Sequence, residues 1–357
     1  MEKPVIRISV RNLVEFILRN GDLESGGTAG DKEAMLKGSR LHRKIQKQMG
    51  SHYQAEVSLK KDTEYEDLIL RVEGRADGIF TQNEKICIDE IKGVYKNLEL
   101  LAEPVLVHRA QALCYAWIYL DDHGLEEIDV QMTYVHLDTE MIKRFRETMT
   151  REELESWYQR LLDSYHKWLS YQMKWREERN RSMEKLEFPF IYRKGQKEMV
   201  AGIYHAISRK EQIFIQAPTG VGKTMSAVFP AVRSIGEGKA ETLFYLTART
   251  ITRTVAQDAF EILRKNGLLF KTVTIIAKEK LCFCEKPECN PETCPYAKGH
   301  YDRINDAVYE LWTNEQSFDR ETILRQAEKW QVCPFEMSLE LSVWMDAVIC
   351  DYNYVFD

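Results

Sequence analysis

The chain has 357 residues, and its 50 Lys and Arg against 56 Asp and Glu give a formal net charge of −6. This mildly acidic balance does not mark the whole chain as a nucleic-acid-binding protein, so any contact with phosphate has to come from local basic patches. The sequence opens with Met-Glu-Lys-Pro and has no apolar run long enough to cross a bilayer. We therefore expect no signal peptide, no membrane partner and a cytoplasmic location.

The first part of the chain alternates helical and strand patterns and predicts a separate domain over residues 1–148, a normal domain size of about 100–200 residues. A strand at 73–79 turns near 81–84 into a second strand at 86–92. This hairpin brings Asp77, Glu90 and Lys92 near one another, and alternation places Glu90 and Lys92 on one face. Two carboxylates and a lysine suit Mg²⁺ binding and activation of a water for phosphodiester attack. An exposed hairpin also carries such charges without any function.

Further residues join this group, namely His42 on a helix upstream and Gln111 and Tyr115 four apart on the helix that follows. In this order the six side chains resemble the RecB-type branch of the PD-(D/E)xK nucleases over residues 6–137. The resemblance implies a mixed sheet with flanking helices, in which Asp77 and Glu90 hold Mg²⁺ with help from His42. By it, Lys92 assists the water, and Gln111 and Tyr115 support the site or the DNA strand. The alternative is a degenerate nuclease fold that only binds DNA.

Aromatic and apolar residues then recur at helical spacing in a run dense with charge, from Trp157 and Leu161 to Trp168 and Trp175. This pattern predicts a long amphipathic helix from about 151 to 181. We interpret residues 149–185 as a helical connector whose aromatic side chains pack against the protein itself. A platform for stacking bases is the alternative.

Residues 217–224, Ala-Pro-Thr-Gly-Val-Gly-Lys-Thr, predict a phosphate-binding loop between an apolar strand at 212–216 and a helix from about 225 to 235. The glycines allow backbone N–H groups to face phosphate oxygens at a helix N-terminus, which favours anions. Lys223 is expected to reach the β- and γ-phosphates of ATP, and the Thr224 hydroxyl to bind Mg²⁺. The predicted nucleotide-binding residues of this loop are Thr219, Gly220, Val221, Gly222, Lys223 and Thr224.

Five of the eight cysteines, Cys282, Cys284, Cys289, Cys294 and Cys333, fall in one segment rich in Pro, Glu and Asn. Clustered thiols in a reducing cytosol indicate a metal site more than disulfides. No Cys-x-x-Cys pair typical of zinc is present. The irregular spacing favours a [4Fe–4S] cluster held by Cys282, Cys289, Cys294 and Cys333, although spacing alone does not exclude zinc. Cys284 is left out because it lies too close to Cys282.

Residues 188–357 resemble the XPD/DinG-type iron–sulfur helicases of superfamily 2. The motifs that carry the resemblance are Gly-Val-Gly-Lys-Thr, Tyr-Leu-Thr-Ala-Arg-Thr at 245–250, Cys-Pro-Tyr at 294–296, Cys-Pro-Phe-Glu at 333–336 and Asp-Tyr-Asn-Tyr at 351–354. The resemblance implies ATP-driven translocation on single-stranded DNA, with the cluster domain helping to part the duplex. By it, Arg193 and Gln196 match an adenine-reading element, and Thr247, Arg249 and Thr250 match a motif that contacts the DNA backbone.

We therefore expect an α/β protein, a nuclease-like mixed sheet followed by a RecA-like motor domain at 186–357 with the iron–sulfur insertion at about 278–340. The Asp-Glu-x-His box of the family lies beyond Asp357, so the chain is expected to be the front part of a longer helicase that acts on single-stranded or branched DNA in repair or processing. Its expected cofactors are ATP, Mg²⁺ and the cluster; protein partners stay unknown. Basic candidates for phosphate contact are Arg249 and Arg253, and Arg40, Arg43 and Lys44 beside His42. Two alternatives remain, a helicase fragment whose first domain binds DNA without cutting and a zinc-stabilised ATP-dependent switch protein.

Overall fold

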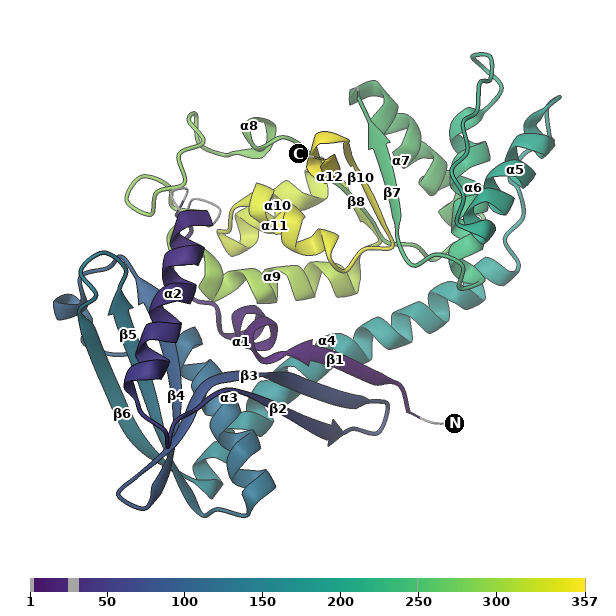
Figure 1. Ribbon diagram of the computed structural model, residues 1–357. Helices are drawn as coiled ribbons and strands as arrows, with labels where there is room; N and C mark the ends of the chain where they lie inside the picture. The colour runs from purple at the N-terminus through teal and green to yellow at the C-terminus, as the bar shows by residue number, and fades with distance from the viewer. Residues whose placement is uncertain (1–2, 25–31, 249, 357) are drawn as a thin grey trace. The chain divides into compact units, whose positions relative to one another are not determined.

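The computed structural model describes residues 3–24, 32–248 and 250–356, which divide into two compact units (Figure 1). The first unit comprises Met1–Asn20 with Gly26–Ser170, and the second comprises Gly21–Ser25 with Tyr171–Asp357. Helix α4 (Arg151–Glu184) covers the range where the aromatic spacing predicts a helix, and it contains the boundary between the units. No helix in the described ranges is long and apolar enough to cross a membrane.

The first unit is built on a mixed sheet in the order β1-β3-β4-β5-β6, with β2 paired to β3 on the side (Figure 1). Its strands are β1 (Val5–Ser9), β2 (Gln54–Glu64), β3 (Ile69–Gln82), β4 (Lys85–Val94), β5 (Glu127–His136) and β6 (Ile142–Thr150). The β1–β3 and β4–β5 pairs are parallel, whereas β2–β3, β3–β4 and β5–β6 are antiparallel. The hairpin predicted from the sequence is β3–β4. Its register pairs Gly78 with Asp89, so Asp77 and Glu90 occupy the next positions.

Helices complete this unit: α1 (Val10–Leu18), α2 (Lys32–Gln48), the short 3-10 helix η1 (Leu98–Leu100) and α3 (Leu106–His123). Helix α3 packs against β4 and β5, and every residue from Ala110 to Ile118 is buried. It ends at Gly124, whose φ of +64° is the left-handed conformation common at helix C-termini. The buried Leu41 and Ile45 seat α2 on Ile91 of β4. Both helices therefore reach the strand that carries Glu90 and Lys92.

The second unit contains a parallel sheet in the order β7-β10-β8-β9 (Figure 1). Its strands are β7 (Leu243–Thr247), β8 (Thr272–Thr274), β9 (Ser317–Phe318) and β10 (Ala347–Asp351). Its helices are α5 (Gln196–Arg209), α6 (Lys223–Gly236), α7 (Thr250–Lys265), α8 (Lys278–Leu281), α9 (His300–Asn314), α10 (Arg320–Trp330), α11 (Pro334–Ser342) and α12 (Asn353–Phe356). The buried faces of α6 and α7 meet β10 in one apolar core around Val232, Phe260 and Ile349. Together the two units confirm the expected α/β class.

One predicted element is wrong: residues 212–216 do not form a strand, although they lead directly into the phosphate-binding loop. A β-strand needs a neighbouring strand to take its backbone hydrogen bonds. Among the described residues no strand pairs with this segment. Its apolar side chains lie in solvent, with Phe214 95% exposed. The sheet of this unit begins instead at β7 (Leu243–Thr247), and the short β8 (Thr272–Thr274) is the next strand in the chain.

Candidate functional site

The phosphate-binding loop of the second unit has the backbone that its glycines predict. Gly220 and Gly222 have φ of +82° and +81°, a region that side chains other than glycine rarely enter. Gly222 is the N-cap of α6, so the first backbone N–H groups of that helix are free to face an anion. The Lys223 ammonium curls over the loop and donates to the carbonyl oxygens of Ala217 and Pro218 at 3.0 and 3.3 Å.

Gln196 and Arg193 lie beside the loop, as the adenine-reading assignment requires. The buried Gln196 accepts a 2.9 Å hydrogen bond from the backbone N–H of Arg193, whose guanidinium donates to the carbonyl of Gly220. The cavity that these residues share measures about 710 Å³. Such a volume suits a nucleotide. It is lined by the loop, by the start of α6, by α7 and by an apolar side at Phe190 and Ile191.

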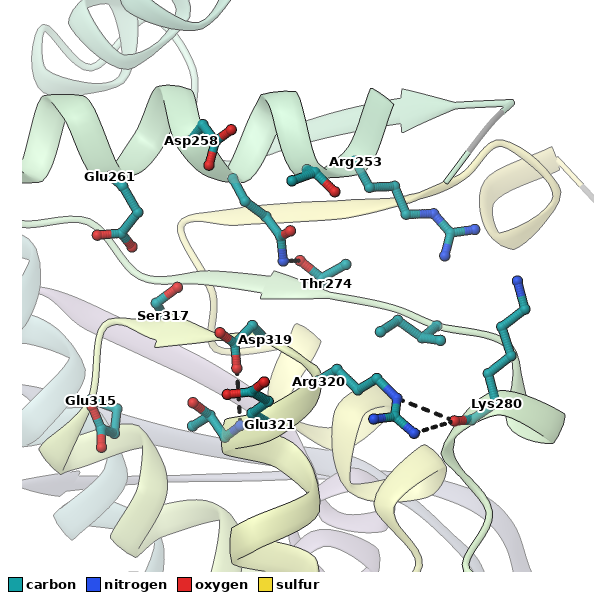
Figure 2. A pocket seen from close by; sticks show the side chains of 14 residues that line it. Arg253, Asp258, Glu261, Thr274, Lys280, Glu315, Ser317, Asp319, Arg320 and Glu321 are labelled. Carbon is teal, nitrogen blue, oxygen red and sulfur yellow. Dashed lines mark hydrogen bonds between the residues drawn. The ribbon is translucent and has the colours of Figure 1, made fainter. Parts of the chain in front are cut away.

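A second cavity of about 600 Å³ lies between α7, β8 and the start of α10, and Figure 2 shows its lining. The Asp319 carboxylate caps α10 by accepting from the backbone N–H of Thr322 at 2.9 Å, and Gln257 donates to the Thr274 hydroxyl. Arg320 donates to the carbonyl oxygen of Lys280 at 3.3 Å, which ties α10 to the end of α8 (Figure 2). This contact holds the segment that enters the cysteine-rich region.

The residues predicted to contact the DNA backbone are not among the described residues that line this cavity. Thr247 is buried at the end of β7, Thr250 is the first residue of α7, and Arg249 lies outside the described residues. Arg253 is buried and forms an ion pair with Asp351. The sequence names Arg253 as a basic candidate for phosphate contact; the residue lines the second cavity, and its role stays a prediction.

The cysteine segment folds so that four thiols gather in one small cluster. Cys289, Cys294 and Cys333 are buried together, and the half-buried Cys284 packs against them. The Cys284 sulfur lies 3.8 Å from that of Cys294. Cys282, the residue chosen from spacing, is the half-buried C-cap of α8; it is outside the apolar cluster, but its thiol interacts with that of Cys284. The structure thus brings three of the predicted ligands together with Cys284 and places the fourth, Cys282, at the edge of the same group.

Apolar surroundings and backbone contacts hold these thiols in place. Leu23, far away in the sequence, is buried in the same cluster, and its backbone N–H donates to the carbonyl of Ala297 at 2.8 Å. Cys333 is the N-cap of α11, and burial raises the pKa of its thiol to about 11. Among the described residues no three His, Cys, Asp or Glu side chains are arranged as a formed metal site. The donor atoms themselves, soft thiols packed in one cluster, are of the kind that iron–sulfur clusters and zinc use.

The hairpin of the first unit brings its three predicted side chains into direct contact. The Lys92 ammonium lies 2.8 Å from Oε1 of Glu90, so the two residues share a strand face as predicted. Asp77 accepts a 2.7 Å hydrogen bond from the backbone N–H of Ile91 through Oδ2. Burial raises the pKa of Glu90, the nearby Lys92 charge lowers it, and the Asp77 charge raises it. Both carboxylates therefore sit at one point of the sheet.

The three remaining predicted residues surround this point. Nδ1 of His42 lies 3.6 Å from Oδ1 of Asp77, and Gln111 accepts a 2.6 Å hydrogen bond from Lys92. The Tyr115 ring lies over β3 at Gly74, where an added Cβ would approach its hydroxyl oxygen to 2.7 Å. The structure thus brings all six residues of the predicted group to one end of the β3–β4 hairpin.

The open carboxylate atoms of this group fit a divalent cation. Oε2 of Glu90 is buried and has no hydrogen-bond partner among the residues that the structure describes, which costs free energy unless an ion or water meets it. Oδ1 of Asp77 has the imidazole of His42 as its neighbour, with Nδ1 at 3.6 Å. Mg²⁺ is commonly held by one or two carboxylates together with water and substrate phosphate. Two carboxylates with open atoms therefore suffice for such a site.

Asp89, which precedes Glu90 in the chain, is not part of this group. It is fully buried and accepts hydrogen bonds from Tyr53, Gln131 and Thr133, the last at 2.6 Å. Both of its carboxylate oxygens accept hydrogen bonds, and those from Gln131 and Thr133 fasten β4 to β5. Only Glu90 of the Asp-Glu pair presents an open carboxylate oxygen.

The fold and the loop define the second unit as an α/β, RecA-like domain of the P-loop class. Sequence comparison goes further: residues 193–282 match the DEAD/DEAH box helicase family, and residues 267–357 match the DEAD_2 family. The chain therefore carries helicase domains across residues 193–357, and this part of the predicted resemblance is confirmed.

Two curated relatives are similar to part of the chain. "Regulator of telomere elongation helicase 1 homolog" from Caenorhabditis briggsae is 22% identical over 220 residues, which cover 49% of this chain and 22% of that protein. The protein of the same name from Caenorhabditis elegans is 22% identical over 216 residues, covering 48% and 22%. The chain thus spans about a fifth of the length of these relatives. The solved "Crystal structure of SSO0001" is 19% identical with a TM-score of 0.30, over 44% of this chain and 75% of that one, too low a score to establish a shared fold.

Proposed function

We propose that the chain is part of an ATP-driven DNA helicase of the XPD/DinG type, joined to a metal-dependent DNA nuclease. The nucleotide cavity carries the first half of this proposal, because its loop, Gln196 and Arg193 converge on one space inside the region that matches helicase families. Lys223 and the α6 N-terminus would bind the phosphates, and Thr224 would bind Mg²⁺. Titration of the chain with a fluorescent ATP analogue tests this. Binding that Lys223→Ala leaves unchanged would exclude the site.

The cysteine cluster is the proposed place of a [4Fe–4S] group. Cys289, Cys294 and Cys333 would supply three ligands, and Cys282 or Cys284 the fourth. When bound, the group cross-links chain segments that are far apart in the sequence, which fixes the fold of the insertion that helps to part a duplex. Anaerobic purification followed by iron and sulfide analysis tests it. Colourless protein that carries zinc would instead support the zinc-stabilised switch protein.

The predicted side chains around the β3–β4 hairpin support the second half of the proposal, the nuclease. Asp77 and Glu90 would hold Mg²⁺, with His42 at its edge, while the Lys92 ammonium, fixed by Glu90 and Gln111, would orient the attacking water and offset charge on the phosphate. The open Oε2 atom of buried Glu90 is the observation that supports this most directly. The chain should cut DNA in Mg²⁺ and lose that activity in Glu90→Ala and in Lys92→Ala. Cutting that survives both changes overturns the site, and DNA binding without cutting in Mg²⁺ or Mn²⁺ supports the binding-only alternative.

A further inference from the structure

A cavity of about 550 Å³ opens beside the proposed nuclease site, and none of the six predicted site residues except His42 lines it. Its other walls come from α2, β2 and β3: Ser39, Arg43, Gln46, Glu56 and Arg75. Two of the lining residues touch Asp77, since His42 approaches its carboxylate and Gln46 donates to its carbonyl oxygen at 3.0 Å. The cavity therefore adjoins the proposed metal site at Asp77.

Two arginines supply positive charge to this space. Arg75 precedes Asp77 by two residues on β3, so both side chains leave the same face of the strand. Arg43 follows His42 on α2, and its Nε donates to the carbonyl oxygen of Ser39 at 3.3 Å, one helical turn away. Guanidinium groups bind phosphate oxygens through paired N–H donors. Both arginines line the cavity, so a backbone phosphate that entered it would meet both guanidinium groups.

Glu56 holds one of these arginines in the free protein. Its carboxylate lies 3.2 Å from Arg75, and the two side chains remain 48% and 63% exposed. An exposed pair of this kind contributes little to stability and is screened by salt, so a phosphate can displace the carboxylate.

The backbone at Glu56 has a conformation that is unusual for a strand residue. The β2–β3 ladder pairs Ala55 with Gly78 and Val57 with Ala76 in one continuous register, so Glu56 lies opposite Asp77, although these two residues are not themselves paired. Glu56 has φ of +57°, a backbone conformation that is unfavourable for residues other than glycine. Gln46 donates to Glu56 at 3.1 Å as well as to the carbonyl oxygen of Asp77. The strained residue therefore fixes its carboxylate against Arg75 and α2 at once.

We propose that this cavity binds a backbone phosphate of the single-stranded DNA that the nuclease site cuts, through Arg43 and Arg75. Until the phosphate replaces it, the Glu56 carboxylate pairs with Arg75 and keeps its guanidinium at the cavity. The inference rests on the proposed nuclease function for its substrate, but the phosphate site itself does not require any cutting.

Chemical protection of arginines tests the site directly in the full chain. The unmodified protein is treated with phenylglyoxal with and without a single-stranded oligonucleotide, in EDTA so that no metal-dependent cutting occurs, and modified residues are found by mass spectrometry. Arg43 and Arg75 should lose reactivity several-fold when DNA is present. Arg11, 74% exposed and paired with Glu15 on α1, serves as the internal reference. Equal modification of Arg43 and Arg75 with and without DNA overturns the proposal, whatever DNA the helicase domain binds.

Two variants should shift DNA affinity in opposite directions. Glu56→Gln keeps the hydrogen bond from Gln46 but frees Arg75, so binding should tighten about two-fold. Arg75→Ala should weaken binding and lower the slope of log K against log salt concentration by about 0.7. Arg71→Ala removes a similar cross-strand pair with Asp62, four residues along β3 and outside the cavity, and should change neither quantity. Weaker binding in Glu56→Gln, or an Arg75→Ala slope equal to that of Arg71→Ala, contradicts the proposal.

The two experiments distinguish a failure of the phosphate site from a failure of the nuclease proposal. If DNA protects the arginines but Mg²⁺ gives no cutting, the phosphate site stands and the nuclease proposal falls. If the chain cuts DNA but Arg43 and Arg75 stay fully reactive in the complex, the nuclease stands and this cavity has no role in holding its substrate.

Discussion

The Lys92 ammonium of β4 donates a 2.6 Å hydrogen bond to the side-chain oxygen of Gln111 on α3. Lys92 also lies against Glu90, so the helix and the strand together fix its position. Helix α3 is buried along most of its length and cannot shift easily. A lysine held on two sides loses little conformational freedom when substrate arrives, which suits a group that must orient a water.

Gln111→Leu should therefore slow DNA cutting without preventing DNA binding. The substitution keeps the size of the side chain but removes the acceptor, so Lys92 is held by Glu90 alone. Partners of this kind affect activity about 10–100-fold. Single-turnover cleavage in Mg²⁺ measures the loss. Gln159→Leu on the exposed face of α4 is the matched control, and a Gln111→Leu rate equal to that of the control would show that α3 does not position the lysine.

The sequence was sufficient to predict features whose parts are close together along the chain. The phosphate-binding loop and the β3–β4 hairpin follow from glycine spacing and from strand alternation, and the structure has both. The features that the sequence did not predict depend on segments that are far apart in the chain. Leu23 reaches the cysteine cluster, Gln46 reaches Asp77, and the run at 212–216 has no neighbouring strand in the described part of the chain, because long-range packing decides all three.

The choice between Cys282 and Cys284 illustrates the same limit and gives a second prediction. Spacing could not separate two cysteines two residues apart, but the fold packs Cys284 against Cys294. We expect Cys284→Ser to lower the iron and sulfide content of anaerobically purified protein strongly, and Cys282→Ser to lower it little. Each variant is the control of the other, since both change one sulfur to oxygen in the same short segment. The reverse order of iron loss would restore Cys282 as the fourth ligand.

Gly222→Ala should abolish nucleotide binding. An added Cβ would approach Nε2 of Gln196 to 2.5 Å, and the φ of +81° adds a backbone cost of about 1–2 kcal/mol. Gln196 would have to leave its bond to Arg193, so the adenine side of the cavity would change as well. Gly238→Ala separates the two effects, because Gly238 has φ of +71° with nothing within 4 Å of an added Cβ. Thermal unfolding should shift in both variants, but affinity for a fluorescent ATP analogue should fall only in Gly222→Ala. Normal binding by Gly222→Ala would mean that Gln196 can move freely.

Lys271 should make the stability of the second unit depend on pH. Its ammonium is buried against Trp175 and donates to the carbonyl oxygens of Trp312 and Glu315, at 2.5 and 2.6 Å. Burial lowers the pKa of Lys271 from 10.5 to about 8. Between these values the unfolded chain binds more protons than the folded one, so the free energy of unfolding should rise as pH rises from about 8 to 10.5.

The measurement is chemical denaturation followed by tryptophan fluorescence across that pH range, comparing the chain with Lys271→Met. The difference in unfolding free energy between the two should grow in favour of Lys271 by at most about 1.4 kcal/mol per pH unit. Lys265→Met, at the exposed end of α7, shows what the removal of one charge does alone. A difference for Lys271→Met that stays constant with pH would mean that the two carbonyl oxygens and the indole ring hold the ammonium charged throughout, and that burial does not favour its neutral form.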